Sequence, residues 1–181
     1  MRNFYLFIVI FSLLFTSCVA ENSPKTKDYN PEQKLEELGI QLSSPSSPVA
    51  NYVNTVRTGN LIFISGKGPL KTDGNYVLGK LGENLTLEQG YEAARLTAIN
   101  LISTLKATIG DLSKVKRVVR VTGMVNSTSD FIDHPKVVNG CSDLLVEVFG
   151  DNGKHTRAAV GMNSLPLNIA VEIDMIVEVY D

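Results

Sequence analysis

Residues 153–181, GKHTRAAVGMNSLPLNIAVEIDMIVEVYD, contain the pattern that decides the fold. They predict a loop, a short strand, a tight turn and a long final strand with the two-residue alternation of a strand that buries one face. The alternating sets are Val171, Ile173, Met175 and Val177 against Glu172, Asp174, Ile176 and Glu178. Arg157 begins the short strand, and Glu172 enters the long one. If the two strands lie side by side, this cation and this carboxylate can share one site.

Apolar periodicity predicts the rest of the domain in the order strand, strand, helix, strand, helix, strand, strand. Thr86 can cap the longest helix together with Gln89, and Gly110 can end it. Such an order favours an α/β fold with one mixed sheet and two helices packed on one face. The expected ranges are a short helix at 31–40, a hairpin at 51–66, a glycine-rich loop at 67–85, a helix at 86–110, a strand at 115–126 and a helix at 133–150.

The second face of this sheet has no predicted element to cover it. Its strands carry apolar residues on more than one side, and the chain has no spare helix. Copies of the same chain that pack sheet against sheet would bury such a face. We therefore expect a homo-oligomer.

The N-terminal residues 1–18 have the composition of an export signal. Arg2 precedes an apolar run from Phe4 to Phe15, and small residues lead to Cys18. Two alternatives remain: lipidation of Cys18, which would tether the protein to a membrane, or cleavage after Ala20, which would release a periplasmic or secreted protein. Residues 19–30 are polar and predict a flexible tether. Residues 31–181 then form a single domain of about 150 residues, long enough to bury a core.

Composition argues against several kinds of site. The net charge is -2 with no basic block, so we expect no nucleic-acid surface. His134 and His155 lack ligand neighbours at metal-binding spacing, so we expect no metal. Cys141 has no partner for an intrachain disulfide in the mature chain and is expected to be a buried thiol.

Four segments together resemble the Rid (reactive intermediate deaminase) family, also called YjgF-like. They are PVANYVNTVRTGNLIFISGKGPL, the stretch LEQGYEAARLTAINLISTLKATIGDLSKVKRVVRVTGMVN, HPKVVNGCSDLLVEVFG and RAAVGMNSLPLNIAVEIDMIVEV. The similarity covers about residues 33–180 and is nearest to a longer subgroup with V-x-x-R-V-x-G-x-V-N and N-G-x-S-D-L-L. It implies a chorismate-mutase-like fold of the bacillus type, a homotrimer whose sheets form a central barrel, and clefts between subunits.

The same resemblance implies roles for individual residues. Arg157 would bind the carboxylate of a 2-imino acid, and Glu172 would position the attacking water, with no cofactor. Both residue types suit this chemistry, because a guanidinium grips a carboxylate with two parallel hydrogen bonds and a carboxylate can pass protons. Further binding positions are implied at Tyr52, Ser65, Asn139 and the backbone of Ala159.

The sequence departs from the family pattern at two positions near these residues. Lys67 replaces the glutamine of the S-G-Q motif, which puts a cation at the expected cleft edge, and Ala158 replaces a hydroxyl residue after Arg157. The leading hypothesis is hydrolytic deamination of imino or enamino acids to keto acid and ammonia. A non-catalytic trimeric binding module for small carboxylates is the main alternative, and an isomerase of the chorismate-mutase kind is a weaker one.

Overall fold

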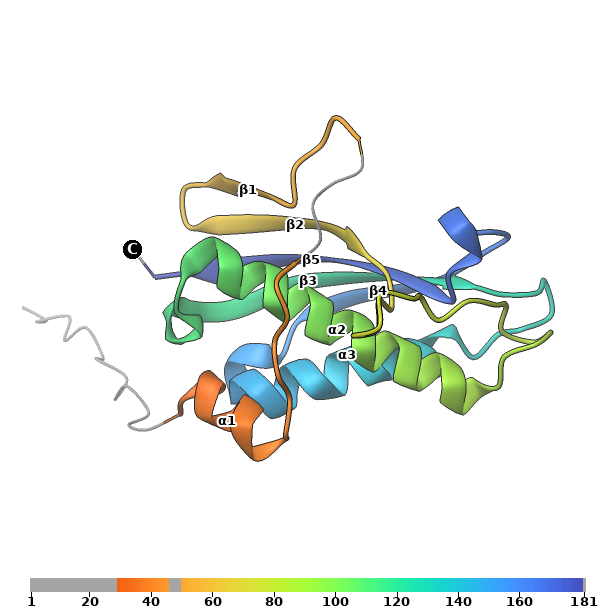
Figure 1. Ribbon diagram of the computed structural model, residues 1–181, viewed down its shortest axis with the longest axis horizontal. Helices are drawn as coiled ribbons and strands as arrows, with labels where there is room; N and C mark the ends of the chain where they lie inside the picture. The colour runs from red at the N-terminus through yellow and green to blue at the C-terminus, as the bar shows by residue number, and fades with distance from the viewer. Residues whose placement is uncertain (1–28, 46–49, 181) are drawn as a thin grey trace, which may run out of the picture.

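The computed structural model describes residues 29–45 and 50–180 (Figure 1). The export signal at 1–18, the lipidation site Cys18, cleavage after Ala20 and most of the 19–30 tether lie outside the described residues. Within the described ranges, no helix is long and apolar enough to cross a membrane. Export and lipidation therefore stay predictions.

The main elements follow the predicted order, with a short helix in front. They are α1 (Pro31–Glu37), β1 (Thr55–Thr58), β2 (Leu61–Lys67), α2 (Leu87–Ile109), β3 (Val115–Asn126), α3 (His134–Phe149), β4 (Thr156–Met162) and β5 (Val171–Val179). Short 3₁₀ turns occur at Leu112–Lys114, Gly150–Gly153 and Pro166–Asn168. The predicted hairpin is present, but its first strand begins at Thr55, so Tyr52 lies before it.

One mixed sheet forms the centre of the domain, in the order β1-β2-β5-β3-β4. Strands β3 and β4 run parallel, and the other neighbours are antiparallel. Helices α2 and α3 lie across one face, as predicted (Figure 1). Strand β5 alternates buried and half-buried residues along its whole length, which confirms the predicted alternation. Its buried residues Val171, Ile173, Met175 and Val177 join the helices in one hydrophobic core.

Local signals of α2 and α3 explain how the helical layer forms. Thr86 Oγ1 accepts the backbone N–H of Gln89, whose side chain accepts the N–H of Thr86, so the predicted capping box is confirmed. A Cβ at Gly140 in α3 would lie 2.0 Å from the carbonyl oxygen of Tyr91 in α2. The two helix backbones therefore touch at this glycine, which fixes α3 over the sheet.

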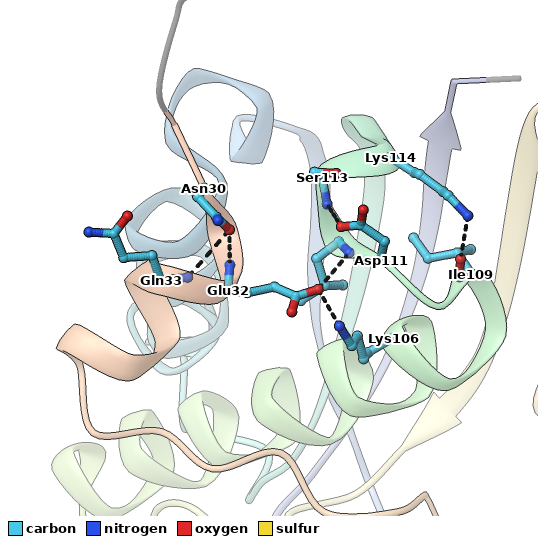
Figure 2. Close-up of polar contacts among 9 residues, drawn as sticks. Asn30, Glu32, Gln33, Lys106, Ile109, Asp111, Ser113 and Lys114 are labelled. Atoms are coloured by element: carbon cyan, nitrogen blue, oxygen red, sulfur yellow. Dashed lines mark hydrogen bonds and ion pairs between the residues drawn. The ribbon is translucent and has the colours of Figure 1, made fainter.

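Helix α1 is attached to the end of α2 by polar contacts (Figure 2). Asn30 caps α1 by accepting the backbone N–H groups of Glu32 and Gln33. The Glu32 carboxylate accepts from Lys106 Nζ and from the N–H of Leu112 at 3.2 Å. The Lys106 bond holds the pKa of Glu32 below its usual value. The domain therefore includes Asn30, the last residue of the predicted tether.

The face of the sheet opposite the helices is uncovered by any described element. Its apolar residues include Val56, Phe63 and Val160, which are 55%, 40% and 42% exposed. Apolar side chains gathered on a flat surface favour burial against another molecule. Assembly of several chains through this face stays a prediction.

The strand order corrects one expectation. Arg157 and Glu172 were expected on strands lying side by side, but β3 lies between β4 and β5. The connection from β3 through α3 makes β4 parallel to β3, and β5 then pairs with the other edge of β3. Arg157 is aligned with Val121 of β3, whereas Glu172 is aligned with Met124. Arg157 and Glu172 therefore do not lie on adjacent strands.

Candidate functional site

Arg157 lies at the start of the edge strand β4, on the face that the helices cover. Its partner in the register, Val121, is fully buried beneath the helices. The guanidinium Nη1 donates to Asn139 Oδ1 at 2.9 Å and to Ser142 Oγ at 3.0 Å, and both acceptors belong to α3. Nη2 makes a longer contact of 3.5 Å with the carbonyl oxygen of Pro135. The structure thus brings Arg157 and the predicted Asn139 together at the exposed edge of the sheet.

Ala159 lies on the same side of β4, two residues beyond Arg157. It is aligned with Gly123 and packs partly buried against the core. Because alternate residues of a strand face the same side, Ala159 continues the surface that begins at Arg157. Three of the predicted positions, Arg157, Asn139 and Ala159, therefore form one group.

Two residues that the sequence reading did not assign complete this group. Ser142 Oγ lies 3.0 Å from His155 Nε2, and His155 Nδ1 lies 2.6 Å from the carbonyl oxygen of Gly153. Burial lowers the pKa of His155, and the nearby charge of Arg157 lowers it further, whereas the bond to Gly153 opposes both effects. We call Arg157, Ala159, Asn139, Ser142 and His155 the arginine site.

The spacing could have pointed to both missed residues. Ser142 follows Asn139 by three positions, which places the two on one face of a helix. His155 precedes Arg157 by two positions, the period of a strand face. Cys141 adjoins this group, and burial raises the pKa of its thiol to about 12. It is the buried, unreactive thiol that the sequence predicts.

Glu172 lies on the opposite face of the sheet. Its neighbours Val171 and Ile173 are fully buried under the helices, so the Glu172 side chain points away from them. Burial, and secondly the charge of Asp174, raise the pKa of Glu172. The carboxylate lies over β2: a Cβ at Gly66 would be only 2.2 Å from Glu172 Oε1. Gly66 therefore leaves the space that this carboxylate occupies.

Ser65, next to Gly66, holds the segment in front of β1. Its hydroxyl lies 2.6 Å from the carbonyl oxygen of Val53 and 3.0 Å from that of Asn54. Tyr52 belongs to this segment and is 51% exposed. Ser65 and Gly66 line an open hollow of about 410 Å³ together with apolar residues of the uncovered face. We call Glu172, Gly66 and Ser65 the carboxylate site; no contact of Tyr52 with Glu172 is found among the described residues, so its role stays a prediction.

Lys67 follows Ser65 and Gly66, but its side chain lies on the helix side of the sheet, and its expected place at the edge of a cleft between subunits stays a prediction. Lys67 is aligned with the buried Ile173, and its Nζ donates to Asn54 Oδ1. With Asn100 and Thr104 of α2 it lines a small polar pocket on the helix side. Burial lowers the pKa of its ammonium group. The sheet therefore separates Lys67 from the Glu172 carboxylate.

The predicted residues thus form two sites rather than one. The arginine site lies between β4 and α3, and the carboxylate site lies on the uncovered face of β5 and β2. Within one chain β3 separates the two strands, and the two functional side chains point to opposite faces. A ligand that contacts both Arg157 and Glu172 needs residues from more than one copy of the chain.

A family model and a curated relative each match most of the chain. A family model described as "YjgF/chorismate_mutase-like, putative endoribonuclease" matches residues 32–179. Protein TCP17 of Trypanosoma cruzi is 43% identical over 145 residues, which are 80% of this chain and 91% of TCP17. The family match spans both the arginine site and the carboxylate site.

Two solved structures are similar over most of their length. Protein Atu1372 of Agrobacterium tumefaciens is 42% identical with a TM-score of 0.78, covering 83% of this chain and 92% of that chain. A protein of Shewanella oneidensis MR-1 is 34% identical with a TM-score of 0.80, covering 83% and 99%. These likenesses confirm the predicted fold, with its mixed sheet and its helices on one face.

Proposed function

Because this chain belongs to the YjgF/chorismate mutase-like family, we propose that it hydrolyses small 2-imino acids at a site shared between copies of the chain. Arg157 of one copy binds the substrate carboxylate, and Glu172 of a neighbouring copy positions the water. The observation that carries the proposal is the placement of these two groups on opposite faces of one sheet, with Arg157 at its exposed edge. The homotrimer implied by the family resemblance is the assembly that we propose.

The arginine site supports the binding half of this reaction. A guanidinium is always charged at neutral pH and offers hydrogen bonds in a planar fork that matches a carboxylate. Asn139 and Ser142 hold Nη1 in place from α3. A substrate carboxylate at Arg157 would place its imine carbon near the backbone of Ala159.

The carboxylate site supports the chemical half. Water adds to the imine carbon, and the C=N bond becomes a C–N bond as Glu172 accepts a proton from the water. Glu172 then returns this proton to nitrogen, which gives a carbinolamine. In a second transfer Glu172 moves the hydroxyl proton to the amino group, the C–N bond breaks to release ammonia, and the oxygen remains as the carbonyl of a 2-keto acid. A carboxyl group with a raised pKa is a stronger base than an exposed one and so suits both transfers.

The chemistry needs no external oxidant or reductant, because replacing the C=N bond by a C=O bond leaves the oxidation state of the carbon unchanged. Positioning of water beside an electrophilic carbon can supply much of the acceleration. Export of the protein, with or without lipidation at Cys18, is part of this proposal, and it would place the reaction outside the cytoplasm.

The proposal is tested with an imino acid generated in place by an amino acid oxidase. We expect the wild-type protein to accelerate release of ammonia and keto acid above the buffer rate, and Arg157→Ala to remove the acceleration. Equal rates with and without protein would contradict it. Binding of a keto acid at Arg157 without any turnover would select the non-catalytic binding module instead.

A further inference from the structure

We propose that Ser142 and His155 are positioning residues that fix the Arg157 guanidinium, so that only its Nε–Nη2 edge is presented to a ligand. The inference rests on the proposed function for its ligand, but its geometric part concerns this chain alone.

The hydrogen bonds from His155 to Arg157 have only one consistent direction. His155 Nδ1 is 2.6 Å from the Gly153 carbonyl oxygen, which can only accept, so Nδ1 carries the proton. In a neutral ring Nε2 is then an acceptor, and the Ser142 hydroxyl 3.0 Å away donates its single hydrogen to it. The Ser142 oxygen is therefore left to accept from Arg157 Nη1, 3.0 Å away. Each bond determines the direction of the next.

The Gly153 carbonyl, where this series of hydrogen bonds begins, is held rigidly. A Cβ at Gly153 would lie 2.1 Å from the carbonyl oxygen of Leu145, so the backbone at Gly153 packs directly on α3. Ser142 also belongs to α3. His155 is thus held between a packed turn and a helix, and its ring cannot turn without breaking the bond to Gly153.

The bonds at Arg157 leave a single free edge. Nη1 has two hydrogens, and both are used, one by Ser142 and one by Asn139 Oδ1 at 2.9 Å. Nη2 makes only the 3.5 Å contact with Pro135, and no acceptor for Nε is found among residues 29–45 and 50–180. The Nε hydrogen and the second Nη2 hydrogen form a parallel pair that fits a carboxylate.

Burial supports the neutral ring that this arrangement needs. The lowered pKa of His155 keeps Nε2 unprotonated at neutral pH. A proton on Nε2 would reverse its bond to Ser142, deprive the Ser142 hydroxyl hydrogen of its acceptor and add a second positive charge beside Arg157.

Two substitutions at His155 separate the bond to Ser142 from the bond to Gly153. Glutamine places its terminal amide near the position of Nε2 and can still accept from Ser142. Asparagine reaches only the position of Nδ1 and can still donate to Gly153, but it leaves Ser142 without an acceptor. Binding of 2-oxobutyrate is measured by calorimetry for wild type, His155→Gln, His155→Asn, Ser142→Ala and Arg157→Ala.

We expect Ser142→Ala and His155→Asn to weaken binding by about tenfold, the size of one hydrogen bond to a charged group. We expect His155→Gln to stay within about threefold of wild type. In turnover, Ser142→Ala should raise KM and leave kcat nearly unchanged, because the bond serves substrate and transition state alike. If Ser142→Ala and His155→Asn bind like wild type while Arg157→Ala loses binding, the inference is overturned.

A measurement without ligand keeps this outcome separate from failure of the proposed function. The ¹⁵N NMR shifts of His155 should show a proton on Nδ1 and a lone pair on Nε2, and the Ser142→Ala variant should shift the Nε2 and Arg157 signals. A proton on Nε2 in the wild type would overturn the inference whatever binds. If the NMR result is as expected but Arg157→Ala binds and reacts like wild type, the proposed function is contradicted. The inference that Ser142 and His155 fix the Arg157 guanidinium is then still supported.

Discussion

The arginine site and the carboxylate site differ in how much of each is complete within one chain. Arg157 meets the side-chain acceptors Asn139 and Ser142 in a fixed arrangement between β4 and α3. Glu172 is half-buried, the like charge of Asp174 adds to the effect of burial in raising its pKa, and no ion pair forms at it within the described residues. A bound cation lowers the energy of a carboxylate, whereas burial beside another acid raises it. The arginine site is therefore preorganised by its own chain. The carboxylate site instead holds a carboxyl group with a raised pKa, which suits a proton acceptor.

The largest difference between the sites should appear on removing Arg157. We expect Arg157→Ala to lower kcat/KM for an imino acid by about 100-fold or more, because the charge and both hydrogen bonds to the carboxylate are lost. Arg157→Lys keeps the charge but not the planar fork, so it should recover only part of the loss. Steady-state kinetics and calorimetry with 2-oxobutyrate give both quantities. Full activity in Arg157→Lys would contradict a forked carboxylate contact.

Removing the charge of Glu172 should have a different signature. We expect Glu172→Gln to lower kcat by about 100-fold, as for loss of a general base, while affinity for 2-oxobutyrate stays close to that of wild type. Arg157→Ala, measured in parallel, should lose affinity as well as rate. If Glu172→Gln weakens binding as strongly as Arg157→Ala, both residues hold the ligand and the division into two roles is wrong.

The smallest expected effect concerns stability against pH. Because the folded pKa of Glu172 is raised, its contribution to stability is fully present below its unfolded pKa and is lost as the pH rises through the folded pKa. Glu172→Gln should therefore melt at a higher temperature than wild type at pH 7, and the gap should close as the pH falls to about 4. Thermal denaturation across this range measures the gap.

Ile132→Ala is the control for this titration. The Ile132 side chain is 81% exposed and has no titratable group, so the difference in melting temperature between Ile132→Ala and wild type should stay constant across the same pH range. A gap between Glu172→Gln and wild type that does not depend on pH would show that the carboxyl group titrates normally.

Local patterns predicted the elements well because each pattern is produced by neighbouring residues. The capping box at Thr86, the strand at 115–126 and the alternation of β5 all depend on spacing along the chain. The family resemblance implied that Arg157 and Asn139 belong to one cleft, and the structure places the two in contact.

The order of the strands in the sheet could not be predicted from such local patterns. Only about eight residues separate β4 from β5, a length typical of neighbouring strands, but the connection passes over the end of β3. The parallel pairing of β3 and β4 results from the α3 crossover, which no short window of sequence contains.

The side of the sheet on which Lys67 lies could not be read from the sequence for a related reason. Ile64 and Lys67 are three residues apart and should face opposite sides of a regular strand. A break in the register between them lets both face the helices, aligned with Met175 and Ile173. Such a bulge adds one residue to a strand without a compulsory sequence signal.

The central claim is that Arg157 and Glu172 meet only between chains, and subunit mixing tests it most directly. Arg157→Ala and Glu172→Ala proteins, each inactive alone, are unfolded together in equal amounts and refolded, with each variant refolded alone as the control. In random assembly about one interface in four joins an intact Arg157 to an intact Glu172, so we predict recovery of about a quarter of the wild-type rate. If the refolded mixture stays as inactive as its two components, the site is not shared between chains and the account is contradicted.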